Sequence, residues 1–372
     1  MDFTLGEELE TVRGLAREIF TDHATTERVR AAEAGENRID AELWEQLARA
    51  GLLGTVIDED DGGVGLGIGG LCVLLQEQGR VVAPVPLWSA AVAALAIAEY
   101  GTPQQRAAVL PGVVDGSERI TVALEEFGPV AAAEPACVAK SDGSRWRLTG
   151  VKAVVPTPFG ADRVLVAAMT EQGPGLFLTA TDAEDLRWEH CETTDHDAGG
   201  NLQLDGALAE AVGAPGGGVL DMVLRWAEVA LSALQLGVAE GALAHAAEYL
   251  RERVQFDRPL GSLQAVQHQL ADCYIETDAM RVTLWQAVQA VTELTDGHAP
   301  ASAVLVAKWW AGDSGLNVVH RVQHVHGGIG VDTDYPVHRH FLWGKQISGL
   351  LGGPSATLDR LGSVLVESGA RT

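Results

Sequence analysis

Cysteine is rare in this sequence, and the few cysteines are far apart. The chain has four in 372 residues, and none of them forms a CxxC pair or shows the Cys/His spacing of a zinc site. The spacing therefore predicts neither a disulfide framework nor a metal site. It is typical of a protein kept in a reducing compartment, and we expect a cytoplasmic location.

Basic residues are also few. Lys and Arg number 26 against 51 Asp and Glu, which gives a formal net charge of −25. A surface that acidic repels phosphate backbones and anionic lipid, so we expect no nucleic-acid partner and no membrane partner.

Long apolar runs are missing too. Ser89–Ala98 is Ala-rich and shorter than the ~18–20 residues that cross a bilayer, so it predicts a buried helix. The acidic N-terminus does not resemble a signal peptide.

What the sequence does contain changes character twice along the chain. Residues 1–118 show apolar residues at helical spacing, as in Ala41–Ala50. Residues 119–212 hold short β-branched segments separated by Gly, Asp and Pro, which predicts strands. Residues 213–372 return to long apolar helices. We predict an α+β fold with an N-terminal helical domain, a middle antiparallel β domain and a C-terminal four-helix bundle, bounded by these ranges.

Individual elements of the last two domains can be placed. The residues Ser141–Ser144 form a turn signal, which predicts a hairpin. The predicted strands are Ile120–Leu124, Trp146–Thr149, Arg163–Ala168, Gly175–Thr179 and Asn201–Leu204. The predicted bundle helices are Val219–Arg253, Leu263–Leu294, Ala301–His320 and Gly349–Ser368.

The first segment that could carry chemistry is Arg253–Leu260, directly after a long predicted helix. An Arg at a helix end, followed by an aromatic residue and a Pro-containing turn, could hold an anionic group and stack a ring beside it. The alternative is structural, because a basic residue at a helix C-terminus interacts favourably with the helix dipole. The residues alone leave both interpretations open.

The second segment is His324–Gly330. Its paired glycines, Gly327 and Gly328, would let backbone N–H groups approach a ligand closely. His324 and His326 do not share a helix face, and no carboxylate motif accompanies them, so the pattern does not indicate a metal. A Gly-rich connection between helices is the alternative. The third segment, Asp334–Phe341, predicts a turn and the start of a helix.

In order, these segments read R-x-Q-F-x-x-P-L, then a helix pair, then H-x-H-G-G-x-G-x-x-x-D-Y-P-V-H-R. This series resembles the acyl-CoA dehydrogenase flavoprotein family. The N-terminal half supports the resemblance with LWEQLA at 43–48, GLLG at 51–54 and GGVGL at 62–66. The resemblance covers nearly the whole chain.

The resemblance implies a dimer of dimers in which FAD lies across a subunit boundary. The β domain of one subunit would hold the flavin ring, and the helical bundle of its neighbour would reach the pyrophosphate and adenine. The implied reaction is α,β-dehydrogenation of an acyl-CoA, in which a Glu takes the α proton while a hydride leaves to the flavin. Electron-transfer flavoprotein is the implied electron acceptor.

The sequence departs from the family at the catalytic acid. The family's Glu usually lies in a Y-E-G-T-S-like stretch before the last helix, but here Leu351–Ser355 places Gly352 at that position. A second family position falls at Ala227. Glu228 lies one residue on, which turns its side chain ~100° around a helix. We therefore interpret Glu228 as a surface acid or a buried paired acid, and predict no catalytic residue in this chain.

The expected flavin-ring contacts depart as well. The family's L-T-E-P stretch becomes Leu124–Phe127, with Glu125 in place of a hydroxyl donor to the flavin. The W-[IV]-[ST] strand becomes Val154–Pro156, where the aromatic wall is gone and the proline cannot donate a backbone N–H. A carboxylate beside a reduced flavin is electrostatically unfavourable. We therefore expect the β domain to be unable to hold a flavin ring.

The residues on the bundle side of the implied site are kept much better. Asp257 replaces the usual Gly after the motif's Phe, and a His replaces the usual Gln before the paired glycines. The predicted cofactor-binding residues are Arg253, Phe256, Gln264, His324, Gly327 and Gly328.

Loss of one half of the site and retention of the other is typical of a partner subunit. The pattern resembles the non-catalytic, β-type subunit of α2β2 acyl-CoA dehydrogenases of actinobacterial steroid (cholesterol) catabolism, including the stretches MDFT and LADCYI. We expect FAD shared with a homologous catalytic subunit, and a steroid side-chain CoA thioester as substrate. Two alternatives stay open: a self-sufficient homotetrameric dehydrogenase that uses Glu228 as its base, and a flavin-free scaffold on the same fold.

Overall fold

A computed structural model describes residues 5–293 and 299–369 of the chain. The stretch MDFT at positions 1–4 and the predicted helix end at Leu294 lie outside the described residues. The chain divides into two compact units, which we call unit 1 and unit 2. Unit 1 combines the residues up to Val29, Cys72–Ala83 and the residues from Glu228 onward. Unit 2 contains Arg30–Leu71 and Pro84–Ala227.

The helices of unit 2 follow the apolar spacing of its sequence. The helix α3 (Ala41–Arg49) is capped by Asp40, whose side chain accepts a hydrogen bond from the backbone N–H of Leu43 at 2.9 Å. Its predicted apolar residues Leu43 and Leu47 are buried. The predicted buried helix is confirmed as α5 (Leu87–Tyr100), and α6 (Pro103–Asp115) follows it. Short 3-10 turns lie at η1 (Leu52–Gly54), η2 (Glu59–Asp61) and η3 (Pro158–Gly160).

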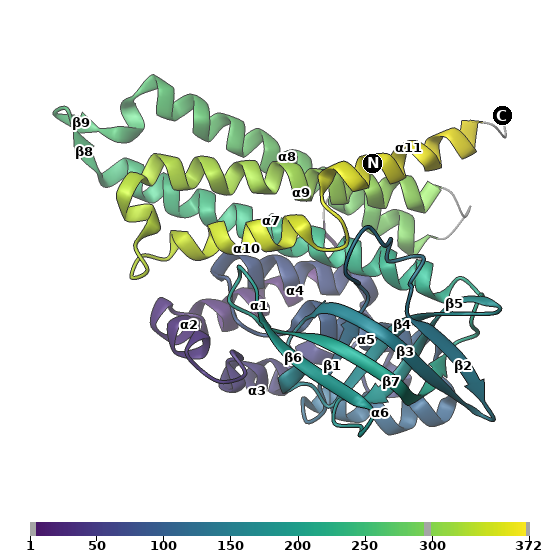
Figure 1. Cartoon of the computed structure of the whole chain (residues 1–372). Coiled ribbons are helices and arrows are strands. Elements are labelled where there is room, and N and C mark those ends of the chain that lie inside the picture. Colours follow the sequence, from purple (N-terminus) through teal and green to yellow (C-terminus); the bar gives the residue numbers. More distant parts are fainter. Residues whose placement is uncertain (1–4, 294–298, 370–372) are drawn as a thin grey trace. The chain divides into compact units, whose positions relative to one another are not determined.

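A seven-stranded sheet forms the rest of unit 2 (Figure 1). Strands β4, β2, β3, β7 and β5 each pair with the next, and β5 pairs back with β4, so five strands close into a ring. Strand β1 pairs with β4, and β6 pairs with β7. Their bounds are β1 Ile120–Ala123, β2 Val138–Asp142, β3 Arg145–Val155, β4 Arg163–Thr170, β5 Gly173–Ala180, β6 Leu186–Glu192 and β7 Ala198–Val212.

The sheet agrees with the predicted strands in most places and differs in three. The turn after Asp142 joins β2 to β3, which confirms the predicted hairpin. The strand β6 was not predicted, and β3 and β7 are longer than expected. Two pairings, β1 with β4 and β2 with β4, are parallel, so the sheet is mixed rather than wholly antiparallel. Its core is apolar and includes Phe177, Leu202 and Val164.

Long helices build unit 1 (Figure 1), where α9 packs against α8, α10 and α11. The helix α7 begins at Val219 in unit 2 and continues through unit 1 to Glu252, within one residue of the predicted end. By length and composition it is the one described helix that could cross a membrane, but it is mostly buried inside the fold, as core helices are. The other elements are α1 Glu7–His23, α2 Thr26–Glu33, α4 Gly67–Val81, β8 Val254–Gln255, β9 Arg258–Pro259, η4 Leu260–Ser262, α8 Gln264–Thr292, α9 Ala299–His326, η5 Gly327–Val331, α10 Val337–Gly349 and α11 Pro354–Gly369.

The C-terminal region differs from a simple four-helix bundle. The structure describes five helices there, because Val337–Gly349 forms a helix of its own and the last predicted helix starts at Pro354 rather than Gly349. The predicted third helix continues past His320 to His326. The helix start predicted near residues 334–341 is confirmed at Val337.

Helices α4 and α7 approach closely because glycines line the contact. A Cβ atom added at Gly237 would lie 2.1 Å from the carbonyl oxygen of Gln76. A Cβ added at Gly79 would lie 2.3 Å from the carbonyl oxygen of Leu234. Only residues without a side chain fit at such a distance between two helix backbones.

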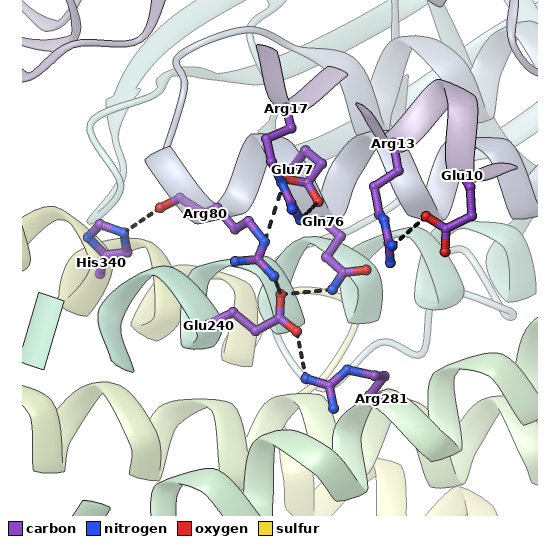
Figure 2. A network of polar contacts seen from close by, with 9 residues as sticks. All are labelled: Glu10, Arg13, Arg17, Gln76, Glu77, Arg80, Glu240, Arg281 and His340. Atoms are coloured by element: carbon purple, nitrogen blue, oxygen red, sulfur yellow. Dashed lines mark hydrogen bonds and ion pairs between the residues drawn. The ribbon is translucent and has the colours of Figure 1, made fainter. Parts of the chain in front are cut away.

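An ion-pair network joins four helices of unit 1 (Figure 2). Arg17 of α1 holds Glu77 of α4 through two hydrogen bonds of 2.7 and 2.9 Å. Arg80 of α4 and Arg281 of α8 contact the two oxygens of Glu240 of α7, at 2.6 and 2.8 Å. Both carboxylates are nearly buried, and each is paired with more than one donor. Such pairing is what allows a charge to remain inside a fold.

Candidate functional site

A tight hairpin carries the first predicted segment. It begins where α7 ends, and the backbone N–H of Leu260 donates to the carbonyl of Arg253 at 2.9 Å. The two turn residues, Phe256 and Asp257, have φ angles of +53° and +60°. Two positive φ angles are typical of the turn that best fits a two-residue hairpin, although the pair is usually Asn-Gly. Phe256 is 80% exposed at its tip.

The residues that the sequence singles out on this hairpin face solvent. Arg253 is exposed, and its guanidinium makes no hydrogen bond or ion pair to any residue that the structure describes. Gln264 is exposed at the first position of α8, just after the short turn η4. An exposed cation and an exposed aromatic ring on a short rigid hairpin suit an anionic ligand or a second chain.

The second predicted segment lies at the end of α9. His324 is exposed on its last turn, whereas His326 is buried, which confirms that the two histidines do not share a face. Gly327 follows with a φ of +62° and begins the 3-10 turn η5. A Cβ added at Gly327 or Gly328 would meet nothing within 4 Å, so the backbone is open there. Among the described residues no group of His, Cys, Asp and Glu could hold a metal ion.

The hairpin of β8 and β9 and the end of α9 lie at the same end of the unit 1 helices (Figure 1), and Tyr249 contacts both segments. Its ring stacks on the imidazole of His326 with centroids 4.7 Å apart. Its carbonyl accepts a hydrogen bond of 2.8 Å from the backbone N–H of Arg253. The hairpin and the Gly327–Gly328 turn are therefore tied to one another through a single tyrosine.

Two buried histidines, His326 and His340, and the half-buried His245 lie at this end of unit 1. Burial lowers the pKa of His326 and that of His245, and burial together with His245 lowers the pKa of His340 to about 4. His340 Nε2 lies 3.0 Å from the carbonyl oxygen of Arg80, and its ring packs against His245. A lowered pKa favours the neutral form of each ring, so these histidines add little positive charge to this end at physiological pH.

Glu228 is placed away from solvent and is already paired. It lies on α7 with 1% of its surface exposed, and an oxygen of its carboxylate forms an ion pair with Arg360 of α11. The neighbouring Ala227 is fully buried. Gly352, at the position where the family has its other acid, has a φ of +89° and no side chain to offer. Neither position therefore presents a free carboxylate.

In the segment of unit 2 expected to contact a flavin ring, backbone N–H groups donate to other residues of the same unit. The backbone N–H of Ala153 donates to the carbonyl of Glu125, and that of Val154 donates to the side chain of Asn201. Pro156 has no N–H, and the N–H of Thr157 donates to Asp197. Val154 and Thr157 also have positive φ angles, which are uncommon for β-branched residues.

A buried ion pair lies beside this segment. Lys152 Nζ is 2.6 Å from an oxygen of Glu126, and both side chains are nearly fully buried. Burial acts to raise the pKa of Glu126, but the hydrogen bonds from Lys152 and from two backbone N–H groups hold it below its usual value. Burial lowers the pKa of Lys152. Because the ammonium group of Lys152 is bonded to Glu126, it is not presented to a ligand beside this segment.

Comparison with known proteins decides the family. The N-terminal domain model of acyl-CoA dehydrogenases matches residues 6–117, and the C-terminal domain model matches residues 216–360. Acyl-CoA dehydrogenase FadE27 of Mycobacterium tuberculosis is 39% identical over the whole of both chains. The chain belongs to the acyl-CoA dehydrogenase family.

Two solved structures of that family resemble this acyl-CoA dehydrogenase chain over nearly its full length. A variant of the Tcur3481-Tcur3483 steroid ACAD is 62% identical with a TM-score of 0.95, and the match covers 99% of this chain and 100% of that one. The ChsE4-ChsE5 complex from Mycobacterium tuberculosis is 38% identical with a TM-score of 0.93, and the match covers 99% of each chain. The expected fold is therefore confirmed, with its N-terminal helices, middle β domain and C-terminal helical region.

The family typically binds FAD, and the residues present fit only part of that cofactor. An exposed arginine and an open Gly-Gly backbone at one end of unit 1 suit a diphosphate. In the segment 153–157 of unit 2, the backbone N–H groups of Ala153, Val154 and Thr157 already donate within the chain, and Pro156 has none. These positions therefore offer no N–H to a flavin ring. The sequence singled out the segments that hold His326 and Tyr335, but it did not reveal that their rings pack with Tyr249, because the contact joins segments far apart in the chain.

Proposed function

We propose that this chain is the non-catalytic subunit of a heteromeric acyl-CoA dehydrogenase. It contributes Arg253, Phe256, Gln264, His324 and the Gly327–Gly328 turn to the adenine and pyrophosphate half of a shared FAD site. A homologous partner chain supplies the contacts to the flavin ring and the catalytic Glu. The assembly is an α2β2 tetramer, and FAD held at the shared site would supply the hydride-accepting chemistry for acyl-CoA oxidation.

One asymmetry carries this proposal. The residues kept from the family are exposed at one end of unit 1 and make no side-chain pairing with the described part of the chain, as expected of a surface that a second chain and a cofactor cover. The residues lost from the family are replaced by closed, internally bonded structure, as at Val154–Thr157. Glu228 is bound by Arg360, which argues against the self-sufficient enzyme that would use it as a base.

The names of the relatives support a partner and a substrate class. One similar structure is named as a complex of two proteins, and another is named as a steroid acyl-CoA dehydrogenase. We therefore propose a steroid side-chain CoA thioester as substrate, electron-transfer flavoprotein as electron acceptor, and a cytoplasmic location for the complex.

The chain's own residues would bind and orient rather than react. The guanidinium of Arg253 suits a phosphate oxygen because its fork of N–H donors can form charge-assisted hydrogen bonds. The open backbone at Gly327 and Gly328 allows N–H groups to approach the same diphosphate. Phe256, at the exposed tip of the hairpin, offers a flat apolar surface to a ring.

The test is expression of this chain alone and together with a homologous acyl-CoA dehydrogenase chain. We expect the chain alone to purify without flavin absorbance, and the pair to purify as a yellow 2:2 complex that oxidises acyl-CoA. Arg253→Ala in the complex should weaken FAD binding at least ~10-fold, because it removes a charge-assisted contact to phosphate. Arg258→Ala, on the opposite strand of the same hairpin, is the matched control and should leave FAD binding unchanged.

Other outcomes would favour the alternatives. A yellow and active protein from this chain alone, inactivated by Glu228→Gln, would establish the self-sufficient enzyme. A stable 2:2 complex without flavin would establish the scaffold. Equal effects of Arg253→Ala and Arg258→Ala would show that Arg253 has no specific role.

A further inference from the structure

Three aromatic rings meet at the end of α9 where the proposed diphosphate site begins. The imidazole of His326 stacks on Tyr249 with centroids 4.7 Å apart and planes at 23°. It also packs against Tyr335, with centroids 5.5 Å apart. The ring centroids of Tyr249 and Tyr335 are 6.5 Å apart, with the rings edge to face. The three residues come from α7, from α9 and from the loop before α10, so the cluster joins three segments of unit 1.

The imidazole of His326 is fixed in orientation as well as in place. Its Nδ1 lies 2.7 Å from the carbonyl oxygen of Val322, one turn earlier in α9, so Nδ1 carries a proton and donates. Only 3% of the residue is exposed. A ring with a hydrogen bond at its edge and an aromatic neighbour on its face has little freedom to turn.

Each neighbour of His326 leads directly to one part of the proposed site. Gly327 follows it in the chain, and a Cβ added at Gly330 would lie 3.1 Å from the Cβ of His326, so η5 packs on this residue. Tyr249 precedes Arg253 by one helical turn and accepts its backbone N–H. A shift of the imidazole would therefore move the Gly-Gly turn relative to Arg253.

We propose that His326 is a positioning residue that sets the spacing between the Gly327–Gly328 backbone and Arg253, so that both contact one diphosphate. This inference rests on the proposed function, because it assumes that FAD binds at this end of unit 1. His326 does not itself contact the cofactor. It acts through Tyr249, which holds Arg253, and through the turn that follows it.

The experiment measures FAD affinity in the co-expressed complex after removal and re-addition of FAD. His326→Ala should weaken FAD binding about 10-fold, which corresponds to the loss of one or two aromatic contacts. Tyr249→Ala should have a similar effect, and the double variant should be little worse than either, because both act through one stack. His326→Phe keeps the ring and should restore the affinity to within about 3-fold of the wild type.

Two controls separate positioning from general stability. His320→Ala changes an exposed histidine on the same helix and should leave FAD affinity unchanged. Leu284→Ala removes a fully buried side chain from α8 and should lower the melting temperature without changing FAD affinity. If His326→Ala keeps wild-type affinity, or if Leu284→Ala weakens FAD as much as His326→Ala does, the positioning role is wrong.

The Arg253→Ala variant tells the two failures apart. If Arg253→Ala weakens FAD binding and His326→Ala does not, the positioning role fails while the proposed function stands. If neither variant affects FAD binding to a complex that holds flavin, the proposed location of the site fails and the positioning role fails with it.

Discussion

Glu228 of α7 and Arg360 of α11 form an ion pair whose acidic partner is almost fully buried. The pair gives the carboxylate a structural role. We expect Glu228→Gln to lower the free energy of unfolding by about 1–2 kcal/mol, because a charged hydrogen bond is replaced by a neutral one. Turnover in the complex should stay within twofold of the wild type. Denaturant titration and steady-state kinetics measure the two effects, and a loss of turnover above 100-fold with FAD retained would contradict this interpretation.

Gly237 provides a second prediction, from the close approach of α4 and α7. A methyl group there would lie 2.1 Å from the carbonyl oxygen of Gln76, so the two helices would have to move apart. We expect Gly237→Ala to destabilise the chain by about 2–3 kcal/mol despite the better helix propensity of Ala. The matched control is Gly362→Ala on α11, where nothing lies within 4 Å. That variant should gain about 0.5–1 kcal/mol, and equal effects of the two in thermal melts would contradict the close packing.

The buried His340 predicts a loss of stability in acid. Burial and the nearby His245 lower its pKa to about 4, below the ~6.5 of a histidine in an unfolded chain. The unfolded state therefore binds more protons in this interval, and the contribution of His340 to stability is lost as the pH falls from about 6.5 to about 4. The slope for one proton is about 1.4 kcal/mol per pH unit.

Comparison of wild type with His340→Gln isolates this effect. The difference between their free energies of unfolding should depend on pH between 4 and 6.5 and should be constant above pH 7. A wild-type-minus-His340→Gln difference that is flat across this range would show that His340 is not a buried neutral group.

Asp197 in unit 2 predicts the opposite dependence on pH. Burial and the charge of Asp195 raise its pKa to about 7, above the ~3.9 of an unfolded Asp. Stability associated with protonated Asp197 is present in acid and is lost as the pH rises through about 7. Asp197→Asn keeps an oxygen for Thr157 and removes the charge.

We therefore expect Asp197→Asn to unfold at higher temperature than the wild type at pH 8, with a gain of about 1–2 kcal/mol. The gain should shrink below pH 7 and vanish near pH 4. Thermal unfolding at several pH values measures it. A variant that is less stable than the wild type at pH 8 would show that the carboxylate charge is needed at this position.

Sequence patterns located the elements whose residues follow simple rules. The apolar run from Val219 gave the long helix α7 to within one residue of its end, and the Ser-Asp-Gly-Ser turn gave the hairpin of β2 and β3. The strand β6 was missed because its residues, Leu186–Glu192, are mostly exposed and polar, and their apolar alternation is limited to Leu186 and Trp188. The parallel pairing of β1 with β4 was missed because it joins strands that are far apart in the chain.

Burial of polar residues explains the other misses. The start of α10 was predicted, but the segment was not included among the bundle helices because Arg339 and His340, which resemble surface residues in the sequence, are buried in it. His326 was considered only as a metal ligand, whereas its role is visible only when Tyr249 and Tyr335 are brought beside it. The exposed positions of Arg253, Phe256 and Gln264 agree with the predicted binding surface, but their contacts with a cofactor stay a prediction.

The division of unit 1 into three stretches has a consequence for synthesis on the ribosome. Every residue of unit 2 has been translated once residue 227 is made, so that unit can fold while elongation continues. Gln76 and Arg80 are made long before Glu240, which follows Gln76 by 164 residues. Until then Gln76 and Arg80 lack their partner Glu240, and the glycines of α4 face no partner helix. The early stretches of unit 1 can therefore pack fully only after the last stretch has been made. A nascent chain that stalls before Glu240 would expose the polar and glycine face of α4 to proteases and chaperones.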